Sequence, residues 1–415
     1  MKIWIIHQHA ALPNQPGITR HFSLAKGLVA QGHQVVIFTS GRDRFDPARG
    51  PGQDGENTLQ VGGVTFRLVP TGGYQGNGVK RVLDMLAFAL KCLGPKAVAE
   101  LDHPDVVIGC SPHPLSAWAG SRLAKRYRCP FIYEVRDLWP ETLVAFGIPS
   151  WHPVVKVFGA MERRLARAAS AIISPLQGAG AYFARYGIKP ENVLWVPNGI
   201  DPSLVPAMAK VESSREFEIV YAGALGEANA LDKVLEAAAE LKAKPETSHV
   251  RFRLIGSGAQ EERLRRMATE WGLNNVTFAG PVPKDQIYQH LRRASALVVM
   301  LRESPLYRWG ISINKVFDYM AVGRPILFGG TTPYDLVAQS GAGISFSPGT
   351  GPGLAEAVTR MLGLSPEERE AMGLRGRAVV LEQYNLDDHA RNLASCLGGI
   401  NQRHGGVGAL QGAHR

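Results

Sequence analysis

The sequence predicts an α/β protein of two doubly wound domains, each built around a largely parallel sheet with helices on both faces. Its 415 residues exceed what one hydrophobic core supports. Short apolar segments alternate with helical patterns, which is typical of a parallel sheet. The alternation stops near residue 200 and then restarts. We therefore expect domains at 1–200 and 201–385, followed by a C-terminal helix and frayed tail at 386–415.

The first half opens with an apolar segment at 3–6, which is too short for a signal peptide and suits a buried strand. A loop containing prolines and a glycine follows, and then a helix that ends near Gly32. Further strands are expected at 35–38, 105–108, 131–135 and 171–173, with helices at 82–93, 116–126 and 154–168 between them.

The second half repeats this pattern after a linker at 201–215, which contains two prolines and a cluster of charges. Ligands of doubly wound sheets bind outside the carboxyl ends of the strands. If the two domains face each other, the cleft between them is the expected site. Strands are expected at 218–221, 250–255, 276–278, 296–300 and 325–328, with helices at 232–241 and 261–271.

The composition excludes several classes of protein. With 45% hydrophobic and 20% charged residues, the chain is globular rather than disordered or fibrous. Its four cysteines have no metal or redox spacing, which favours a reducing compartment such as the cytoplasm. No apolar run reaches the ~20 residues that cross a bilayer. The net charge is +10, and residues 1–200 contain 22 Lys and Arg against 13 Asp and Glu. The first half therefore meets an anionic partner or carries a solvated basic face.

The segment at 304–328 carries the strongest pattern. Asn314, Lys315 and Asp318 lie near the start of a predicted helix. Unpaired N–H groups and the positive dipole end at a helix N-terminus suit a phosphate, and Lys315 would add a charge there. Asp318 could accept hydrogen bonds from a ribose diol. On spacing alone, a surface helix with an ion pair and a tight turn explains the segment equally well.

The segment KVFDYMAVGRPI at 315–326 resembles the signature helix of family-four glycosyltransferases, which closes their nucleotide-sugar site. VPNGID at 196–201 resembles the hinge of that family, and the segments at 220–238 and 253–264 resemble the opening of its second domain. EVRDLWPE at 134–141 is similar to the bacterial surface-polysaccharide branch, close to fucosamine transferases. The resemblance implies the GT-B fold, with two Rossmann-like domains facing across a cleft. It also implies metal-independent sugar transfer with retention of configuration.

The sequence departs from the family at the donor site. Gly310 stands where the first of two signature acids is expected, and the second acid is Asp318 instead of Glu. Ala224 and Leu225 stand where a basic residue often follows the strand. The resemblance then leaves Lys315 to bind more of the donor diphosphate.

Four glycines are candidates for the donor side. Gly17 follows the first strand, in a loop that the family places against the donor phosphates and the acceptor. A plain turn explains Gly17 as well. Gly256 and Gly258 lack the full dinucleotide fingerprint, because Glu261 stands at its third glycine position. The fourth candidate is Gly223, in the segment at 220–238.

The catalytic candidates follow the strand at 131–135. Asp137 is the first choice to orient or deprotonate the acceptor hydroxyl, and Glu141 is the alternative. Arg136 stands where many family members have a His. An internal ion pair between Arg136 and Asp137 is the structural alternative. The family chemistry also allows the leaving phosphate to take the proton in a front-side reaction.

Three further histidines lie near the ends of strands. Ser111 and His113 follow the strand at 105–108 and are candidates to line the acceptor pocket, although a histidine in such a loop is as often structural. His7 and His9 lie on one side of the first strand. Because no third ligand has a suitable spacing, we expect no metal there.

Two helices of the first domain suggest a membrane-facing surface. On the helix at 79–93, the residues Val79, Val82, Leu83, Leu86, Leu90 and Leu93 fall on one face and are expected in the core. Met85 and Phe88 then point outward, unless they are buried beneath a neighbouring loop. The helix at 154–168 is expected to bury Val154, Met161, Leu165 and Ala168 and to expose Lys156, Arg163 and Arg167. Apolar residues beside basic rows suit anionic headgroups.

The function predicted from sequence is a cytoplasmic glycosyltransferase attached peripherally to the inner face of the cytoplasmic membrane. It would transfer a sugar from a nucleotide diphosphate donor, UDP-linked, to a lipid-pyrophosphate-linked sugar in O-antigen, capsule or exopolysaccharide assembly. The nucleotide-sugar is a substrate, so no cofactor is expected. A UDP-N-acetylglucosamine 2-epimerase and a non-catalytic nucleotide-sugar-binding protein remain alternatives. A nucleic-acid partner is disfavoured, because no binding motif is present.

Overall fold

The computed structural model describes residues 1–13, 19–41, 57–73, 79–111, 113–205, 207, 216–283 and 286–412. The chain forms two compact units. The first contains Met1–Pro197 and Leu386–Arg415, and the second contains Asn198–Asn385. The chain therefore passes between the units twice, and its C-terminal helix belongs to the first unit.

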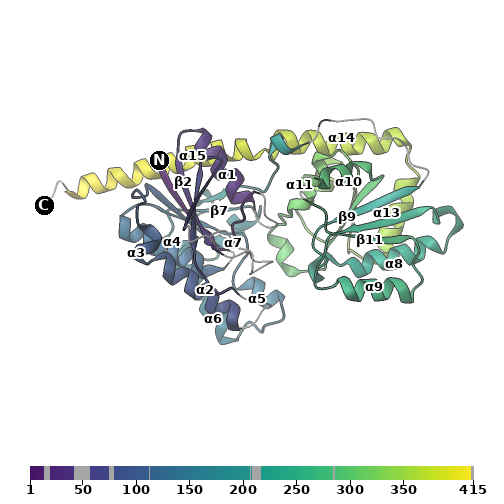
Figure 1. Cartoon of the computed structure of the whole chain (residues 1–415), viewed down its shortest axis with the longest axis horizontal. Coiled ribbons are helices and arrows are strands. Elements are labelled where there is room, and N and C mark those ends of the chain that lie inside the picture. Colours follow the sequence, from purple (N-terminus) through teal and green to yellow (C-terminus); the bar gives the residue numbers. More distant parts are fainter. Residues whose placement is uncertain are drawn as a thin grey trace. The chain divides into compact units, whose positions relative to one another are not determined.

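The first unit is built on an eight-stranded sheet in the order β3-β4-β2-β1-β5-β6-β7-β8 (Figure 1). All its strand pairs are parallel except the hairpin of β3 and β4. The strand order reverses at β1, whose neighbours are β2 and β5, and ligands of doubly wound sheets bind beside this point. The strands are β1 (Lys2–Ile6), β2 (Gln34–Ser40), β3 (Thr58–Val61), β4 (Val64–Val69), β5 (Val106–Cys110), β6 (Phe131–Glu134), β7 (Ala171–Ser174) and β8 (Val193–Trp195).

Helices cover both faces of this sheet (Figure 1). On one face α1 packs against α15, so closely that a Cβ atom on Gly27 would lie 2.5 Å from the Cβ of Ala390. On the other face α4 packs between α2 and α6. The helices are α1 (Arg20–Ala30), α2 (Val79–Cys92), α3 (Pro95–Val98), α4 (Pro114–Tyr127), α5 (Glu141–Ala145), α6 (Pro153–Ala168), α7 (Ala179–Ala184), the 3-10 turn η1 (Pro190–Asn192) and α15 (Leu386–Gly412).

Helix α2 buries the face opposite to the one expected from sequence. Met85 and Phe88 are in the core, whereas Leu83 is 58% exposed and Leu86 is 39% exposed. Both faces of α2 are apolar, so the hydrophobic pattern does not distinguish them, and the larger Phe88 fills the interior. The first unit therefore has an exposed apolar stripe on α2, which consists of Val82, Leu83, Leu86 and Leu90.

The expected core stripe of α6 is also partly wrong. Val155 and Glu162 are buried, whereas Val154 is exposed and Met161 is only partly buried. Leu165 is buried as expected, but Ala168 is exposed. The basic residues Lys156, Arg163 and Arg167 are exposed, as predicted.

The second unit contains a six-stranded parallel sheet in the order β11-β10-β9-β12-β13-β14 (Figure 1). The strands are β9 (Phe217–Ala222), β10 (Val250–Ile255), β11 (Val276–Gly280), β12 (Ala296–Met300), β13 (Ile326–Gly329) and β14 (Gly343–Phe346). The α-helices are α8 (Leu231–Lys242), α9 (Glu261–Glu270), α10 (Ile287–Arg293), α11 (Asn314–Ala321), α12 (Leu336–Ser340), α13 (Gly351–Leu362) and α14 (Pro366–Gln383). The 3-10 turns are η2 (Pro202–Leu204), η3 (Glu227–Asn229), η4 (Pro245–Thr247) and η5 (Pro305–Trp309).

The prediction of two doubly wound sheets is confirmed. The sequence did not predict β3, β4, β8 or β14. Three of these are short edge strands, and β4 lies next to an edge, where it forms a hairpin with β3. At the C-terminus, α15 continues to Gly412, into the stretch that was expected to fray. None of the helices in the described part of the chain is long and apolar enough to cross a membrane.

Candidate functional site

The first candidate site lies at the carboxyl edge of the eight-stranded sheet, where β1, β5 and β6 end side by side. Backbone hydrogen bonds join these ends, since the Ser111 N–H donates to the Glu134 carbonyl at 2.9 Å. The Ser111 hydroxyl accepts from the Arg136 N–H at 3.3 Å and donates to the Asp137 carbonyl at 3.4 Å. Ser111 therefore fixes the backbone that carries both predicted catalytic residues.

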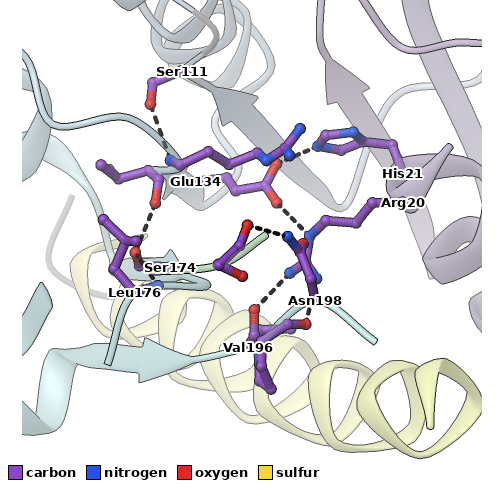
Figure 2. A network of polar contacts seen from close by, with 12 residues as sticks. Arg20, His21, Ser111, Glu134, Ser174, Leu176, Val196 and Asn198 are labelled. Atoms are coloured by element: carbon purple, nitrogen blue, oxygen red, sulfur yellow. Dashed lines mark hydrogen bonds and ion pairs between the residues drawn. The ribbon is translucent and has the colours of Figure 1, made fainter. Parts of the chain in front are cut away.

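A buried carboxylate that the sequence reading missed lies at the centre of this edge. Figure 2 shows Glu134 between the side chains of His21 and Arg20. Its Oε2 lies 2.5 Å from Nε2 of His21, and its Oε1 lies 3.5 Å from Nε of Arg20. All three side chains are buried. A Glu inside the apolar strand segment FIYEV is the signal that could have revealed it, because carboxylates are seldom buried without a partner.

The charges around Glu134 determine its ionisation. Burial by itself would raise its pKa, but His21, Arg20 and Arg136 together hold the pKa of Glu134 well below its ordinary value. Burial also lowers the pKa of His21, against the opposing effect of Glu134. An ionised Glu134 then accepts a hydrogen bond from a neutral His21 that is protonated on Nε2.

Arg20 extends this network to the end of the first unit. Its guanidinium donates to the carbonyl of Val196 at 2.7 Å and also to the carbonyl of Pro197 (Figure 2). Pro197 is the last residue before the chain enters the second unit. Glu134 therefore fixes the side chain of Arg20, and Arg20 fixes the backbone of Val196 and Pro197 at the end of the first unit.

Two other buried histidines adjoin the network. The ring of His7 packs against that of His21 with centroids 4.0 Å apart and a tilt of 43°, and its Nδ1 accepts from the His9 N–H at 3.1 Å. His113 caps α4 by accepting from the Ser116 N–H, and its Nε2 lies 2.6 Å from the Gln8 side-chain oxygen. Burial lowers the pKa of both His7 and His113 well below the ordinary value. Both ring nitrogens of His113 thus have hydrogen-bond partners within the first unit.

His21, Cys110 and Glu134 bring one potential metal-ligand atom each to within 4.8 Å of the others. The electrostatics do not favour a cation at this point. The carboxylate already accepts from His21 and faces Arg20 and Arg136. Burial raises the pKa of the Cys110 thiol well above its ordinary value, whereas metals bind the thiolate. The cluster therefore resembles a buried network of hydrogen bonds and an ion pair more than a metal centre.

The structure separates the two carboxylates that compete for the catalytic role. Asp137 is exposed, just beyond the end of β6. Glu141 begins α5, and its Oε1 lies 2.8 Å from a guanidinium nitrogen of Arg185. The two carboxylates thus differ in exposure, because Asp137 is exposed to solvent whereas Glu141 is partly buried in its ion pair with Arg185.

The second candidate site lies at the carboxyl edge of the six-stranded sheet, where the turns after β9 and β10 touch. A Cβ atom on Gly256 would lie 2.0 Å from the carbonyl oxygen of Gly223, and one on Gly258 would lie 2.5 Å from that of Leu225. Only glycine permits this packing. These predicted donor-side glycines thus bring the two turns into contact beside α11. Gly17 lies outside the described residues.

Lys315 reaches this edge from the first turn of α11. Its Nζ lies 2.8 Å from the Tyr221 hydroxyl oxygen and 2.7 Å from the side-chain oxygen of Asn229. Nζ also lies 4.3 Å from the centre of the Tyr221 ring and close to Gly223. Burial lowers the pKa of Lys315 to about 7. Among the described residues its bonded partners are neutral oxygens and no carboxylate pairs with it, so the positive charge of its protonated form is uncompensated.

The remaining residues of α11 are placed as the helix pattern implies. Asn314 is the exposed first residue of the helix, whose N-terminus has no side-chain cap. Asp318 is partly buried and accepts a hydrogen bond from the Tyr288 hydroxyl at 2.8 Å. Tyr319 hydrogen bonds to the backbone of Ala222 and thereby fixes α11 against the end of β9. The roles of Tyr221, Asn229 and Tyr288 were not anticipated, because these contacts join segments distant in sequence.

The position of the missing first acid has a distinctive backbone. Gly310 has φ 115°, in a region that other residues rarely adopt. A glutamate at this position would be strained. The departure from the family pattern thus extends to the conformation of the chain.

The sheets, their carboxyl-edge sites and α11 define a GT-B glycosyltransferase. The matches to protein families agree: residues 17–199 match the family described as "Glycosyl transferase 4-like domain", and residues 216–363 match "Glycosyl transferases group 1". Together these matches cover about four-fifths of the chain, which belongs to the GT4 family of glycosyltransferases.

Individual relatives are distant. The chain is 24% identical over 398 residues to WcaI of Escherichia coli (strain K12), whose name assigns it to colanic acid biosynthesis as a glycosyl transferase, and the match covers 90% of this chain and 91% of WcaI. Sucrose-phosphate synthase from Thermosynechococcus elongatus superposes with a TM-score of 0.77 at 17% identity, covering 96% of this chain and 98% of that one. Anabaena HepE in complex with UDP has a TM-score of 0.68 at 16% identity, covering 96% and 100%. The two structural matches establish the fold only.

Proposed function

We propose that this glycosyltransferase transfers a sugar, with retention of configuration, from a UDP-linked donor to a sugar carried on a lipid pyrophosphate during the assembly of O-antigen, capsule or exopolysaccharide. The observation that carries the donor class is the uncompensated ammonium of Lys315 beside the glycine turns. A diphosphate would neutralise this charge. The name of WcaI and the UDP complex of HepE support the polysaccharide context and the nucleotide.

The donor would bind at the edge of the six-stranded sheet. Lys315 would contact the diphosphate, with the free N–H groups around Asn314 at the start of α11 adding hydrogen bonds. Asp318, already oriented by Tyr288, would accept from a ribose hydroxyl. The turns at Gly223, Gly256 and Gly258 would let the donor approach the backbone. Gly17, which lies outside the described residues, stays a donor-side candidate on the family resemblance alone.

The chemical step would use the edge of the eight-stranded sheet. The acceptor hydroxyl oxygen forms a bond to the anomeric carbon while the bond from that carbon to the phosphate oxygen breaks. Asp137 orients the hydroxyl and takes its proton, or passes it to the leaving nucleoside diphosphate. Arg136 would balance the negative charge at this position. Ser111 positions both residues through the loop backbone, and His113 positions Gln8 rather than touching the acceptor.

We also propose that the reaction needs no metal ion and takes place at the inner face of the cytoplasmic membrane. The support for the membrane is the exposed apolar stripe on α2 between the exposed lysines Lys80 and Lys91. Exposed apolar side chains flanked by basic ones suit an anionic bilayer surface.

Two assays test the proposed function. In the first, UDP-sugars are incubated with the protein and a lipid-linked sugar acceptor, and sugar transfer is measured. Transfer to the lipid supports the proposal, whereas epimer formed from donor alone would support the 2-epimerase, and binding without turnover would support a binding protein.

In the second assay, the protein is floated with vesicles of phosphatidylglycerol and phosphatidylcholine. Leu83→Glu together with Leu86→Glu should abolish flotation, while Leu374→Glu should not, because Leu374 is similarly exposed but lies in the second unit. Equal flotation of the double variant and wild type would refute the membrane surface.

A further inference from the structure

A cavity of about 650 Å³ lies in the first unit between α4 and α6. Its volume is in the range of small-molecule sites. Five residues of its wall are large and apolar, three of its lining residues are Lys or Arg, and none is Asp or Glu. The apolar residues are Trp118, Phe131, Val157, Met161 and Leu165, and the basic ones are Arg122, Lys125 and Arg164.

This cavity is separate from the proposed sugar-transfer site. It is lined by Cys129 and Pro130, which precede β6, and by Ser170, which precedes β7. Asp137, in contrast, follows the carboxyl end of β6. The cavity therefore opens at the amino end of the strand whose other end carries the candidate base.

The charges at the cavity are not neutralised by the protein. Arg122, Lys125 and Arg164 are exposed, and within the described part of the chain none of them forms an ion pair. Arg122 lies 5.7 Å from the centre of the Trp118 ring, so a positive charge adjoins the apolar wall. A ligand that complements both features has a negatively charged head and a hydrocarbon part.

The apolar wall continues onto the protein surface. Val157 lines the cavity and is 60% exposed, and Val154 and Trp151 near it on α6 and the preceding turn are also exposed. Helix α4 packs against both α6 and α2, whose exposed apolar stripe lies on the same face of the sheet. A ligand in the cavity would thus lie on the same side of the sheet as the surface proposed to face the membrane.

We infer that the cavity binds one molecule of an anionic phospholipid from the bilayer. Its phosphate contacts Arg122, Lys125 and Arg164, and part of an acyl chain lies between Trp118 and Met161. This inference rests on the proposed attachment to an anionic membrane, but it does not depend on the sugar-transfer reaction.

The test is calorimetry of the full-length protein with dioctanoyl phosphatidylglycerol below its micelle concentration. Saturable binding of one lipid per protein is expected. Arg164→Gln should weaken it about tenfold, since it removes one charge-assisted contact. Arg163→Gln is the matched control, because Arg163 is the exposed neighbour of the same charge that does not line the cavity. Ala160→Trp, which fills the cavity, should abolish lipid binding. If the Ala160→Trp protein does not fold, the result for Arg164→Gln tests the inference.

Three outcomes would overturn the inference. Equal weakening by Arg163→Gln and Arg164→Gln would indicate diffuse attraction to the surface. Equal binding of dioctanoyl phosphatidylcholine would remove the role of charge, and equal binding of glycerol 3-phosphate would remove that of the acyl chain. UDP binding is measured in parallel. If the wild-type protein binds the lipid but not UDP, the proposed function is contradicted and the cavity is not. If it binds UDP but not the lipid, only the inference about the cavity is contradicted.

Discussion

The Nζ atom of Lys315 lies 2.8 Å from the hydroxyl oxygen of Tyr221, and this hydroxyl donates in turn to the carbonyl of Ala224 at 2.7 Å. A lysine is thus held over the turn after β9, and its hydrogen-bond partners in the described part of the chain are neutral. The family pattern places a basic residue in that turn, where this chain has Ala224 and Leu225. Lys315 supplies the positive charge from α11 instead.

Donor affinity should depend on pH through Lys315. Its pKa without ligand is lowered to about 7, and a bound diphosphate stabilises the protonated form and raises the pKa. The affinity for the donor is therefore maximal below pH 7. It falls as the pH rises from the pKa of Lys315 in the free protein towards its pKa in the complex, by at most about tenfold per pH unit. Calorimetry with UDP-glucose measures this, because its diphosphate does not titrate near neutrality. Lys315→Arg, which stays charged, should flatten the profile, and an equally steep profile in that variant would assign the effect to another group.

Asp137→Asn should lower turnover by roughly 10²–10⁴-fold and leave donor binding intact, because the amide cannot accept the proton. Asp137 is exposed, so the fold should tolerate the change. Glu141→Gln is the control and should retain most activity, since its carboxylate is paired with Arg185. Steady-state transfer kinetics decide. If Glu141→Gln is inactive and Asp137→Asn is active, the two assignments must be exchanged.

Glu134→Gln should destabilise the protein by about 3 kcal/mol, because it leaves Arg20 buried without its counter-charge. Lys189→Gln is the control, because the ion pair of Lys189 with Glu191 is exposed. This change should lower the free energy of unfolding by less than about 1 kcal/mol. Denaturant unfolding of both variants gives the comparison. A Glu134→Gln protein as stable as Lys189→Gln would show that the buried network does not stabilise the first unit.

Glu162 should make the stability of the protein depend on pH. Its buried carboxyl accepts from the Tyr182 and Tyr186 hydroxyls, and burial raises its pKa to about 8. The folded protein then binds more protons than the unfolded chain from about pH 4.5 to 8, so this contribution to stability is lost as pH rises through that window. Glu162→Gln should remove that part of the pH dependence. The free energy of unfolding is measured against pH for both proteins. If wild type and variant lose stability equally between about pH 4.5 and 8, the assignment to Glu162 is contradicted.

The sequence predicted the two sheets because their strands are continuous apolar runs with helices between them. It predicted that Lys315 and Asp318 lie on one short helix, because spacing within a helix fixes their relative placement, while their role as donor-site residues stays a prediction. Glu134 was missed because its partner His21 is 113 residues away, and no local pattern reports such a pairing. Helix α2 was inverted because large apolar side chains lie on two of its faces, so that only packing in the folded core distinguishes Phe88 from Leu83.

The central claim is that Lys315 binds the diphosphate of a nucleotide-sugar, and calorimetric titration of wild type and Lys315→Ala with UDP tests it most directly. We predict that wild type binds one UDP and that the variant binds it about tenfold to a hundredfold more weakly, with an unchanged melting temperature in the absence of ligand. Equal affinity of the two proteins for UDP would place the diphosphate elsewhere and contradict the account.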